Sequence, residues 1–190
     1  MTTKARPHGP ASGMLETERL RLRGITDSDF DAVHAYASDP EVVEYMTWGP
    51  STEQDTLDFL ARTQAQAAAD PRIDYGLGVV RKSDELLIGA VGLHMPSQDA
   101  HQGMLGYCFA RGAWGHGFAT EAANALLTFG FDVLGLKRIW AGCDPDNAGS
   151  IRVLEKIGMS LEGRHREDVQ IRGSLRDSLM WAILEREWTR

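Results

Sequence analysis

The sequence predicts a single mixed α/β domain, on three observations. Its 190 residues fit one domain. Hydrophobic residues make up 43% and charged residues 25%, the balance of a globular protein. Segments with alternating apolar residues are interspersed with segments whose apolar residues recur at helical spacing, so strands and helices are mixed along the chain. We expect residues 1–13 to form a flexible tail and residues 14–190 to form the domain.

The first part of the domain should contain one strand and two helices. Leucine and arginine alternate over 19–23, which predicts a half-buried strand. Thr26 and Asp29 have the spacing of a capping box and indicate the start of a helix. Ser51 and Gln54 have the same spacing and indicate the start of a second one.

The rest of the domain should contain two further helices among strands. Apolar positions recur at helical spacing through 118–134, which predicts the clearest amphipathic helix of the chain. Asn147 and Gly158 are typical of the first and last positions of a shorter helix. The remaining segments predict strands over 75–81, 86–95, 104–110, 138–143 and on both sides of a turn at 172–173.

Charge and cysteine usage exclude several classes of protein. The chain carries 20 Lys and Arg against 27 Asp and Glu, a formal charge of −7. This charge favours a cationic partner over nucleic acid. No run approaches the ~20 apolar residues of a membrane span, and residues 1–13 lack the apolar segment of a signal peptide. Cys108 and Cys143 lack the spacing of a zinc site and fit a reducing compartment. We therefore expect no metal, no membrane partner and a cytoplasmic location.

The most informative segment is a glycine-rich turn between an expected strand and a long helix, GYCFARGAWGHGFATE over 106–121. Gly115 and Gly117 leave room for close approach to the backbone, and the first amides of a helix are unpaired and carry its positive dipole end. This pattern predicts a site for phosphate or pyrophosphate. The GxxxxGK[ST] pattern is absent, and Thr120 stands where GxGxxG requires a third glycine. A plain structural corner is the alternative.

The stretch GYCFARGAWGHGFATEAANALLTFGFDVLGLKRIWAGCDPDNAGSIRVLEKIGMSLEGR closely resembles the core of the GNAT acyltransferases. With LETERLRLR before it and LEREW after it, the chain is most similar to the Rim-type branch, the relatives of the ribosomal-protein N-acetyltransferases. The resemblance spans roughly 14–188. It implies the GNAT acyl-CoA N-acyltransferase fold, with a mixed, mostly antiparallel sheet of six to seven strands and about four helices. It also implies that acetyl-CoA binds in a V-shaped cleft between the strand before the turn and the strand after the long helix.

The resemblance also assigns the contacts of acetyl-CoA. The strand before the turn would pair with the pantetheine arm, and the turn amides would hold the pyrophosphate. These positions are Tyr107, Cys108, Phe109, Ala110, Gly115, His116, Gly117, Phe118, Ala119 and Thr120. Asn147 would touch the pantetheine arm, although it also fits an N-cap. Ser150 would protonate the departing thiolate, although it also fits an ordinary first-turn residue. Gly112 departs from the family pattern Q/R-x-x-G-x-G/A, with Arg111 beside it.

The identity of the general base is open. Many Rim-type sequences place Glu before [IL]-G-Y, where this chain has Met104, which cannot accept a proton. We take His94 as the candidate base, because histidine ordinarily titrates near neutral pH. His101 is an alternative, as are Glu44 or Asp177 acting through water. An acceptor amine of lower pKa would need a base less, because more of it is neutral at pH 7.

The acceptor site is expected between the link joining the first two helices and the C-terminal hairpin, with Tyr45, Trp48, Met104 and Asp177 lining it. We therefore expect direct acetyl transfer from acetyl-CoA to a primary amine. The acceptor would be a small molecule, such as an aminoglycoside-type antibiotic, or a protein N-terminus. A non-catalytic CoA-binding or sensor domain is the alternative, and a module for ATP or NAD is a third reading. A homodimer is compatible with the sequence, which does not fix the oligomeric state.

Overall fold

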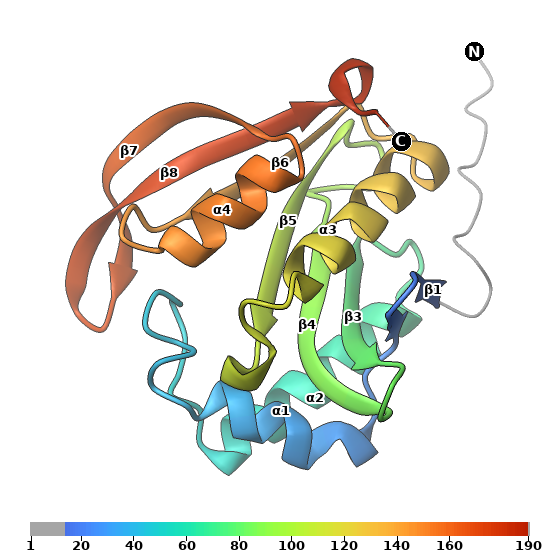
Figure 1. Cartoon of the computed structure of the whole chain (residues 1–190), viewed down its shortest axis with the longest axis vertical. Helices are drawn as coiled ribbons and strands as arrows, with labels where there is room; N and C mark the ends of the chain where they lie inside the picture. The colour runs from blue at the N-terminus through green and yellow to red at the C-terminus, as the bar shows by residue number, and fades with distance from the viewer. Residues whose placement is uncertain (1–13, 190) are drawn as a thin grey trace.

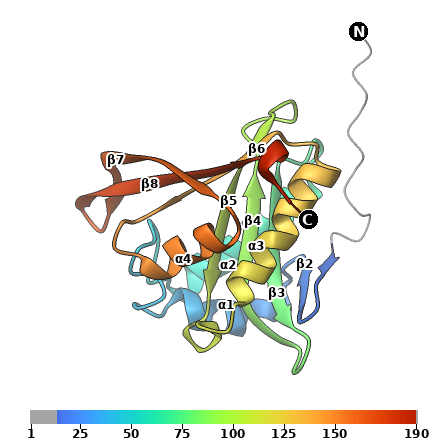
Figure 2. The same cartoon turned by 45° about the horizontal axis from the view of Figure 1, so that its top comes forward.

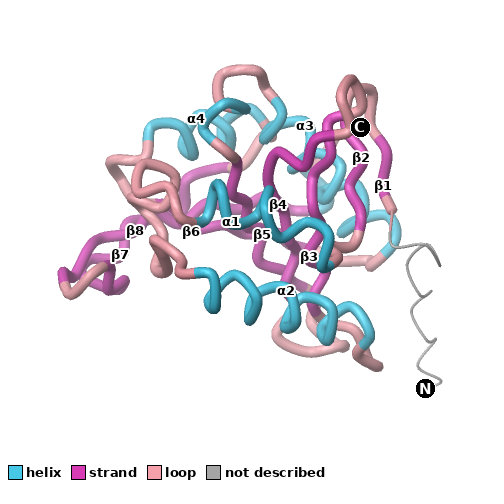
Figure 3. Tube along the Cα trace, turned by 90° about the horizontal axis from the view of Figure 1, so that it is seen from below, coloured by secondary structure: helices cyan, strands magenta, loops and turns pink. Residues whose placement is uncertain are grey.

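The computed structural model describes residues 14–189, and the tail expected at 1–13 lies outside them. Those residues form one eight-stranded sheet in the order β1-β2-β3-β4-β5-β6-β8-β7. The strands are β1 (Leu15–Glu16), β2 (Leu20–Arg23), β3 (Asp74–Arg81), β4 (Leu86–His94), β5 (Gln102–Phe109), β6 (Arg138–Cys143), β7 (Ser160–Ile171) and β8 (Ser174–Leu184). The helices are α1 (Phe30–Ala37), α2 (Glu53–Ala68), α3 (Phe118–Thr128) and α4 (Ala148–Lys156). Helices α1 and α2 cover one face of the sheet and α3 and α4 the other (Figures 1 and 3).

The fold agrees with the expected α/β class and differs in detail. The strand beyond those expected is β1, whose two residues are too short to show alternation. The capping box at Thr26 and Asp29 is confirmed, on a short 3-10 turn before α1. The box expected at Ser51 is wrong by one residue. Thr52 accepts a hydrogen bond from the amide of Asp55, and the Asp55 carboxylate accepts one from the amide of Thr52.

The core forms on both faces of the sheet because alternate strand residues point to opposite sides. Leu20 and Leu22 of β2 are fully buried, as are Leu126 and Leu127 of α3. Burying each such side chain stabilises the fold by about 1.5–3 kcal/mol. On the other face, a smaller cluster that includes Leu60 packs α1 and α2 against the sheet. The two layers hold the central strands firmly on either side of the opening described next.

The sheet opens between β5 and β6, its only parallel neighbours in the described chain. Their pairing runs from Gln102 with Arg138 to Met104 with Trp140 and then stops. Beyond that point β5 continues to pair with β4, and β6 continues to pair with β8. The two central strands therefore diverge, as Figure 2 shows from the tilted view. Main-chain groups along the inner edge of each strand are left without a strand partner.

Candidate active site

A cavity of about 790 Å³ occupies the place where β5 and β6 diverge. Residues 105–108 of β5 and 141–143 of β6 line its two sides, and we call this part the cleft. The cavity continues to α2 and to the link between α1 and α2. Asn147 and Ser150, at the start of α4, also line it. One continuous space therefore joins the parted strands to a second, wider region.

The glycine-rich turn between β5 and α3 has the backbone of an anion site. Gly115 and Gly117 have φ of +78° and +80°, in the left-handed region that glycine adopts without strain. Gly117 is the N-cap of α3 and provides no side-chain cap. Within the described chain, the main-chain N–H groups of 115–120 have no hydrogen-bond partner. Unpartnered amides at a helix N-terminus suit a phosphate or pyrophosphate group, so the turn fits the pyrophosphate of acetyl-CoA.

The β5 positions expected to bind the pantetheine arm divide into two pairs. Tyr107 and Cys108 line the cavity. Phe109 is buried in the core, and its carbonyl accepts a hydrogen bond from the indole of Trp114 at 2.8 Å. The amide of Ala110 donates to the carbonyl of Ile88. The contacts of Phe109 and Ala110 therefore do not favour the pairing expected for them.

The two cysteines of the cavity are unsuited to nucleophilic catalysis. Burial raises the pKa of the Cys108 thiol to about 12. Burial also raises the pKa of Cys143. The reactive form of cysteine is the thiolate, so both remain poorly nucleophilic thiols near neutral pH.

Tyr107 and Ser150 meet at the cleft. Their hydroxyl oxygens lie 2.8 Å apart, and the Asn147 side chain accepts a hydrogen bond from the amide of Ser150 at 2.9 Å. The N-cap expected at Asn147 is confirmed. Burial raises the pKa of Tyr107 well above its ordinary value, so this hydroxyl keeps its proton and can donate it in a hydrogen bond. Sequence reasoning found Ser150 but missed the Tyr107 hydroxyl, because only the fold brings these residues together.

A second polar pair lies where β3, β4 and β5 run side by side. The register places His94 opposite Asp74 on one side and opposite Met104 on the other. His94 Nδ1 is 2.6 Å from Asp74 Oδ1, and all three residues line the cavity. The candidate base therefore stands next to the methionine that occupies the family's glutamate position. Sequence reasoning missed Asp74, since only the strand register identifies it as a neighbour of His94.

The other base candidates do not line the cavity. The Asp177 carboxylate accepts hydrogen bonds from the amide of Glu167 at 3.0 Å and from Arg164 Nε at 2.6 Å. These bonds lower the pKa of Asp177 and hold it on the hairpin, so its expected place in the acceptor wall is not supported. His101 and Glu44 are also absent from the lining.

The wide part of the cavity carries aromatic and acidic side chains. Tyr45 and Trp48 line it from the α1–α2 link, as expected. Helix α2 adds residues that sequence reasoning missed, among them Asp58, Phe59 and Arg62. The carboxylates of the whole lining are Asp55, Asp58, Asp74 and Asp144, against a single arginine, Arg62. The lining therefore has an excess of negative charge.

An open cleft between two strands, ending at an anion-binding turn, is the arrangement of an acyltransferase that uses coenzyme A thioesters. A model of the acetyltransferase (GNAT) domain family matches residues 19–160. The uncharacterised N-acetyltransferase p20 of Bacillus licheniformis is 34% identical over 174 residues, or 92% of this chain and 97% of the relative. The chain therefore belongs to the GNAT family and is an acetyl-CoA-dependent N-acetyltransferase.

Solved structures show the same fold. A GNAT-family acetyltransferase from Bacillus anthracis is 34% identical, with a TM-score of 0.82 over 92% of this chain and 99% of that one. The ribosomal-protein-S5-alanine acetyltransferase of Vibrio fischeri is 23% identical, with a TM-score of 0.77 over 93% and 99%. The similarity to the Rim-type branch is confirmed by the putative ribosomal N-acetyltransferase YdaF of Bacillus subtilis, which is 32% identical over 105 residues, or 55% of this chain and 57% of the relative. In the described residues no helix has the length and apolar character needed to cross a membrane.

Proposed function

We propose that the enzyme acetylates a primary amine of a small molecule that carries more than one positive charge, such as a polyamine or an aminosugar of the aminoglycoside class. The observation that carries this proposal is the lining of the cavity, where Asp55, Asp58 and Asp74 outnumber Arg62, while the fourth carboxylate, Asp144, is paired with Arg176 outside the lining. A site lined by one sign of charge raises the local concentration of ligands of the opposite sign. The formal charge of −7 acts in the same direction.

The aromatic residues of the cavity support the same acceptor class. Tyr45 and Trp48 come from the α1–α2 link and Phe59 from α2. Aromatic faces attract ammonium groups, and such contacts strengthen when they are shielded from water. A protein N-terminus would enter the cavity by the same route, but it need not carry a second positive charge.

The free thiols of Cys108 and Cys143 also support a reducing, cytoplasmic setting.

Two groups of residues would bind the two parts of the donor, acetyl-CoA. The turn amides of 115–120 would hold the pyrophosphate, and Tyr107, Cys108 and Asn147 would line the pantetheine arm. Bound acetyl-CoA supplies an acetyl group activated as a thioester. With the donor between the parted strands, the acceptor amine approaches the thioester from the wide part of the cavity, where His94 lies.

His94 accepts the proton that the acceptor nitrogen loses. With Nδ1 turned to Asp74, Nε2 is the nitrogen left to take a proton, and the carboxylate stabilises the imidazolium that forms. The nitrogen–carbon bond of the product forms as the carbon–sulfur bond breaks. The hydroxyls of Tyr107 and Ser150 provide hydrogen bonds to the sulfur that leaves. The sulfur takes a proton from the Ser150 hydroxyl, which regains one from water, and His94 releases its proton to water. One amide and one thiol result, without a covalent enzyme species.

A thiol-release assay with a matched panel of amines tests the proposal. Spermidine, an aminoglycoside, a monoamine and a short peptide with a free N-terminus are compared at equal pH, and mass spectrometry identifies each acetylated product. We expect kcat/KM to be highest for the polycationic amines. Preference for the peptide would reject the small-molecule acceptor. Binding of CoA without thiol release from any amine would instead favour the non-catalytic sensor domain.

A further inference from the structure

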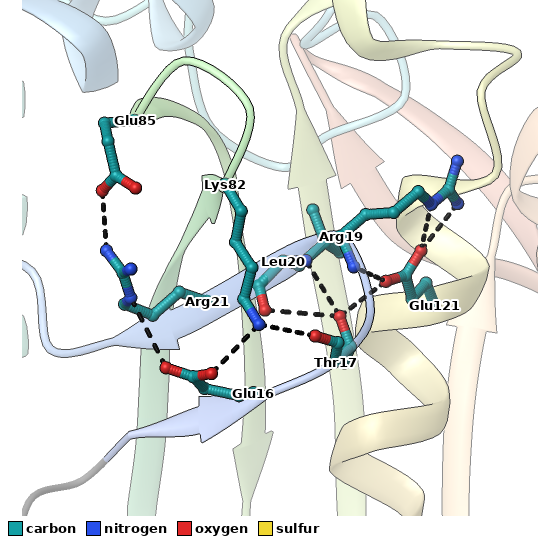
Figure 4. Close-up of polar contacts among 8 residues, drawn as sticks. All are labelled: Glu16, Thr17, Arg19, Leu20, Arg21, Lys82, Glu85 and Glu121. Carbon is teal, nitrogen blue, oxygen red and sulfur yellow. Dashed lines mark hydrogen bonds and ion pairs between the residues drawn. The ribbon is translucent and has the colours of Figure 1, made fainter.

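The segment between β1 and β2 is tied to the first turn of α3, more than 100 residues away in sequence (Figure 4). Glu121 Oε1 accepts hydrogen bonds from the Thr17 hydroxyl at 2.5 Å and from the Arg19 amide at 2.9 Å. Glu121 Oε2 accepts one from Arg19 Nε at 2.7 Å and lies 2.6 Å from Nη2. Both carboxylate oxygens are therefore engaged by this one segment.

The same arginine also reaches the glycine-rich turn. Arg19 Nη1 donates a hydrogen bond to the carbonyl of His116 at 2.9 Å. Its guanidinium lies over the Phe118 ring, 4.7 Å from the centroid. A β-carbon built on Gly117 would lie 3.5 Å from Arg19 Nη2. Arg19 thus contacts His116 and Phe118 and lies beside Gly117 between them.

The negative charge of Glu121, close to the proposed pyrophosphate site, is neutralised by Arg19. Burial raises the pKa of Glu121, but the hydrogen bonds from Thr17 and Arg19 outweigh it, and the net pKa lies below its ordinary value. Glu121 is therefore ionised at neutral pH. A carboxylate in the first turn of a helix would compete with and repel a pyrophosphate at the same terminus, because both are anions. Its pairing with Arg19 removes most of that repulsion.

We propose that Arg19 is a positioning residue for the donor: it fixes the backbone of the turn through His116 and neutralises Glu121, so that the turn binds the pyrophosphate of acetyl-CoA. This inference rests on the assignment of 115–120 as the pyrophosphate site. It gives a role to an ion pair whose arginine is largely exposed and whose glutamate is partly buried. The function of the Arg19–Glu121 pair is to hold the glycine-rich turn in the conformation that binds pyrophosphate.

Arg21, two residues further along in β2, provides a matched control. Its Nη1 lies 2.6 Å from Glu85 Oε2 and its Nε 3.7 Å from Glu16 Oε1 (Figure 4). Like Arg19, it is a partly exposed arginine paired with carboxylates. Within residues 14–189 its side chain forms no hydrogen bond or ion pair with the turn. Arg21→Gln therefore removes the same charge without affecting the contacts between Arg19, Glu121 and the turn.

Calorimetric titration with CoA tests the inference on Arg19→Gln, Arg21→Gln and the wild type. We expect the Kd for CoA to rise about 10-fold in Arg19→Gln, the loss of one charge-assisted interaction, and to stay within twofold in Arg21→Gln. The KM for acetyl-CoA should rise with it, while kcat and the acceptor KM hold. With S-acetyl-pantetheine, which lacks the pyrophosphate and nucleotide, kcat/KM should be the same in all three proteins.

The outcomes separate the inference from the assignment on which it rests. An unchanged CoA affinity in Arg19→Gln, or an equal loss with S-acetyl-pantetheine, overturns the role of Arg19. A wild type that uses S-acetyl-pantetheine as well as acetyl-CoA overturns the pyrophosphate site itself. Should Arg19→Gln fail to fold by circular dichroism, Arg19→Lys replaces it, because lysine keeps the charge but lacks the planar fork with which Arg19 bonds the Glu121 carboxylate and the His116 carbonyl at once. A smaller loss of CoA affinity, again absent with S-acetyl-pantetheine, is expected there, and wild-type CoA affinity would reject the positioning of the turn through His116.

Discussion

Asp74 Oδ1 lies 2.6 Å from Nδ1 of His94, and the strand register sets Met104 on the other side of that histidine. The carboxylate is the ordinary hydrogen-bond acceptor for an Nδ1–H group, so it fixes the tautomer in which Nε2 is free. In many Rim-type sequences the glutamate at the position of Met104 would serve as base. In the proposed mechanism the base is instead His94, on the neighbouring strand β4, with Asp74 as its carboxylate partner.

Replacing His94 by Gln should lower kcat/KM by about 10²–10⁴-fold, the usual range for loss of a general base. The pH–rate profile should also lose an inflection that all acceptors share in the wild type, since that inflection belongs to the enzyme. Without the base, log kcat/KM should rise with slope near one up to the pKa of each acceptor amine. Profiles for two amines of different pKa check this.

Asp74→Asn and His101→Gln complete that comparison. Asp74→Asn should shift the shared inflection and reduce kcat by less than His94→Gln, because asparagine can still hold the ring but cannot stabilise the imidazolium. His101 is outside the cavity lining, so His101→Gln should leave the profile unchanged. A shared inflection that survives in His94→Gln contradicts the assignment of the base.

Tyr107→Phe and Ser150→Ala should each reduce kcat about 10-fold with little change in the Kd for CoA. The two hydroxyls are 2.8 Å apart, and in the proposed mechanism each orients the other toward the sulfur that leaves. Their effects should therefore be non-additive, so the double variant should lose little more than one single variant. Single-turnover rates and CoA titrations measure this. Additive losses would show that the hydroxyls act independently, and unchanged turnover in Ser150→Ala would leave it an ordinary helix residue.

Site residues can be predicted from the sequence when the pattern that identifies them lies within one short segment of the chain. The turn at Gly115 and Gly117 and the N-cap at Asn147 are contiguous patterns, so they could be located before the fold was known. Asp74 is 20 residues from His94 and becomes its neighbour only through the antiparallel register. The α2 residues such as Asp58 were missed because helical spacing shows which face packs on the core, while the cavity lies at the edge of that face.

The C-terminal hairpin was predicted correctly, but the role predicted for Asp177 in the acceptor wall is not supported. The hairpin was expected, and its two strands are present. The β7–β8 register, however, shifts between His165 and Val169. This irregularity brings the amide of Glu167 and the side chain of Arg164 onto the Asp177 carboxylate. Sequence periodicity alone does not reveal such a shift.

Gly117→Val should abolish CoA binding while leaving a folded protein. Valine is strained at φ +80°, and its side chain would fill the space beside the turn amides. Gly173 is the matched control, with φ +84° and no atom within 4 Å of a built β-carbon. Gly173→Val should show a similar drop in Tm, because the backbone strain is the same, but should bind CoA normally. Equal CoA affinity in the two variants would place the pyrophosphate site elsewhere.

Asp29→Asn should destabilise the protein at neutral pH by about 1–3 kcal/mol, because it leaves Arg23 with a poorer partner. Burial raises the pKa of Asp29, but hydrogen bonds from Arg23 and Thr26 outweigh it and the net pKa is lowered. A lowered folded-state pKa stabilises the fold above the unfolded-state pKa, about 3.9, and this stabilisation is lost as pH falls through the folded value. The difference in unfolding free energy between wild type and variant should therefore be constant from pH 6 to 8 and shrink below about pH 4. Asp84→Asn, at an exposed pair with Arg81, should show a much smaller difference throughout.

The last prediction concerns the link that carries Tyr45 and Trp48 into the cavity. Arg172, in the turn between β7 and β8, donates hydrogen bonds to the carbonyl of Glu44 at 3.0 Å and to that of Val43 at 2.5 Å. The hairpin thus holds the backbone immediately before Tyr45. Loss of this contact should loosen the acceptor wall while leaving the turn that binds the donor intact.

Arg172→Gly tests this contact. Arg172 has φ +45°, so glycine removes the side chain without adding backbone strain. We expect the acceptor KM to rise about 10-fold, the loss of about 1.4 kcal/mol of binding, with the Kd for CoA unchanged. Arg164→Ala, which removes an arginine of the same hairpin that pairs with Asp177, should change neither value. A rise in the Kd for CoA equal to the rise in acceptor KM would mean that the hairpin supports the whole fold, and an unchanged acceptor KM would mean that the link keeps its position without Arg172.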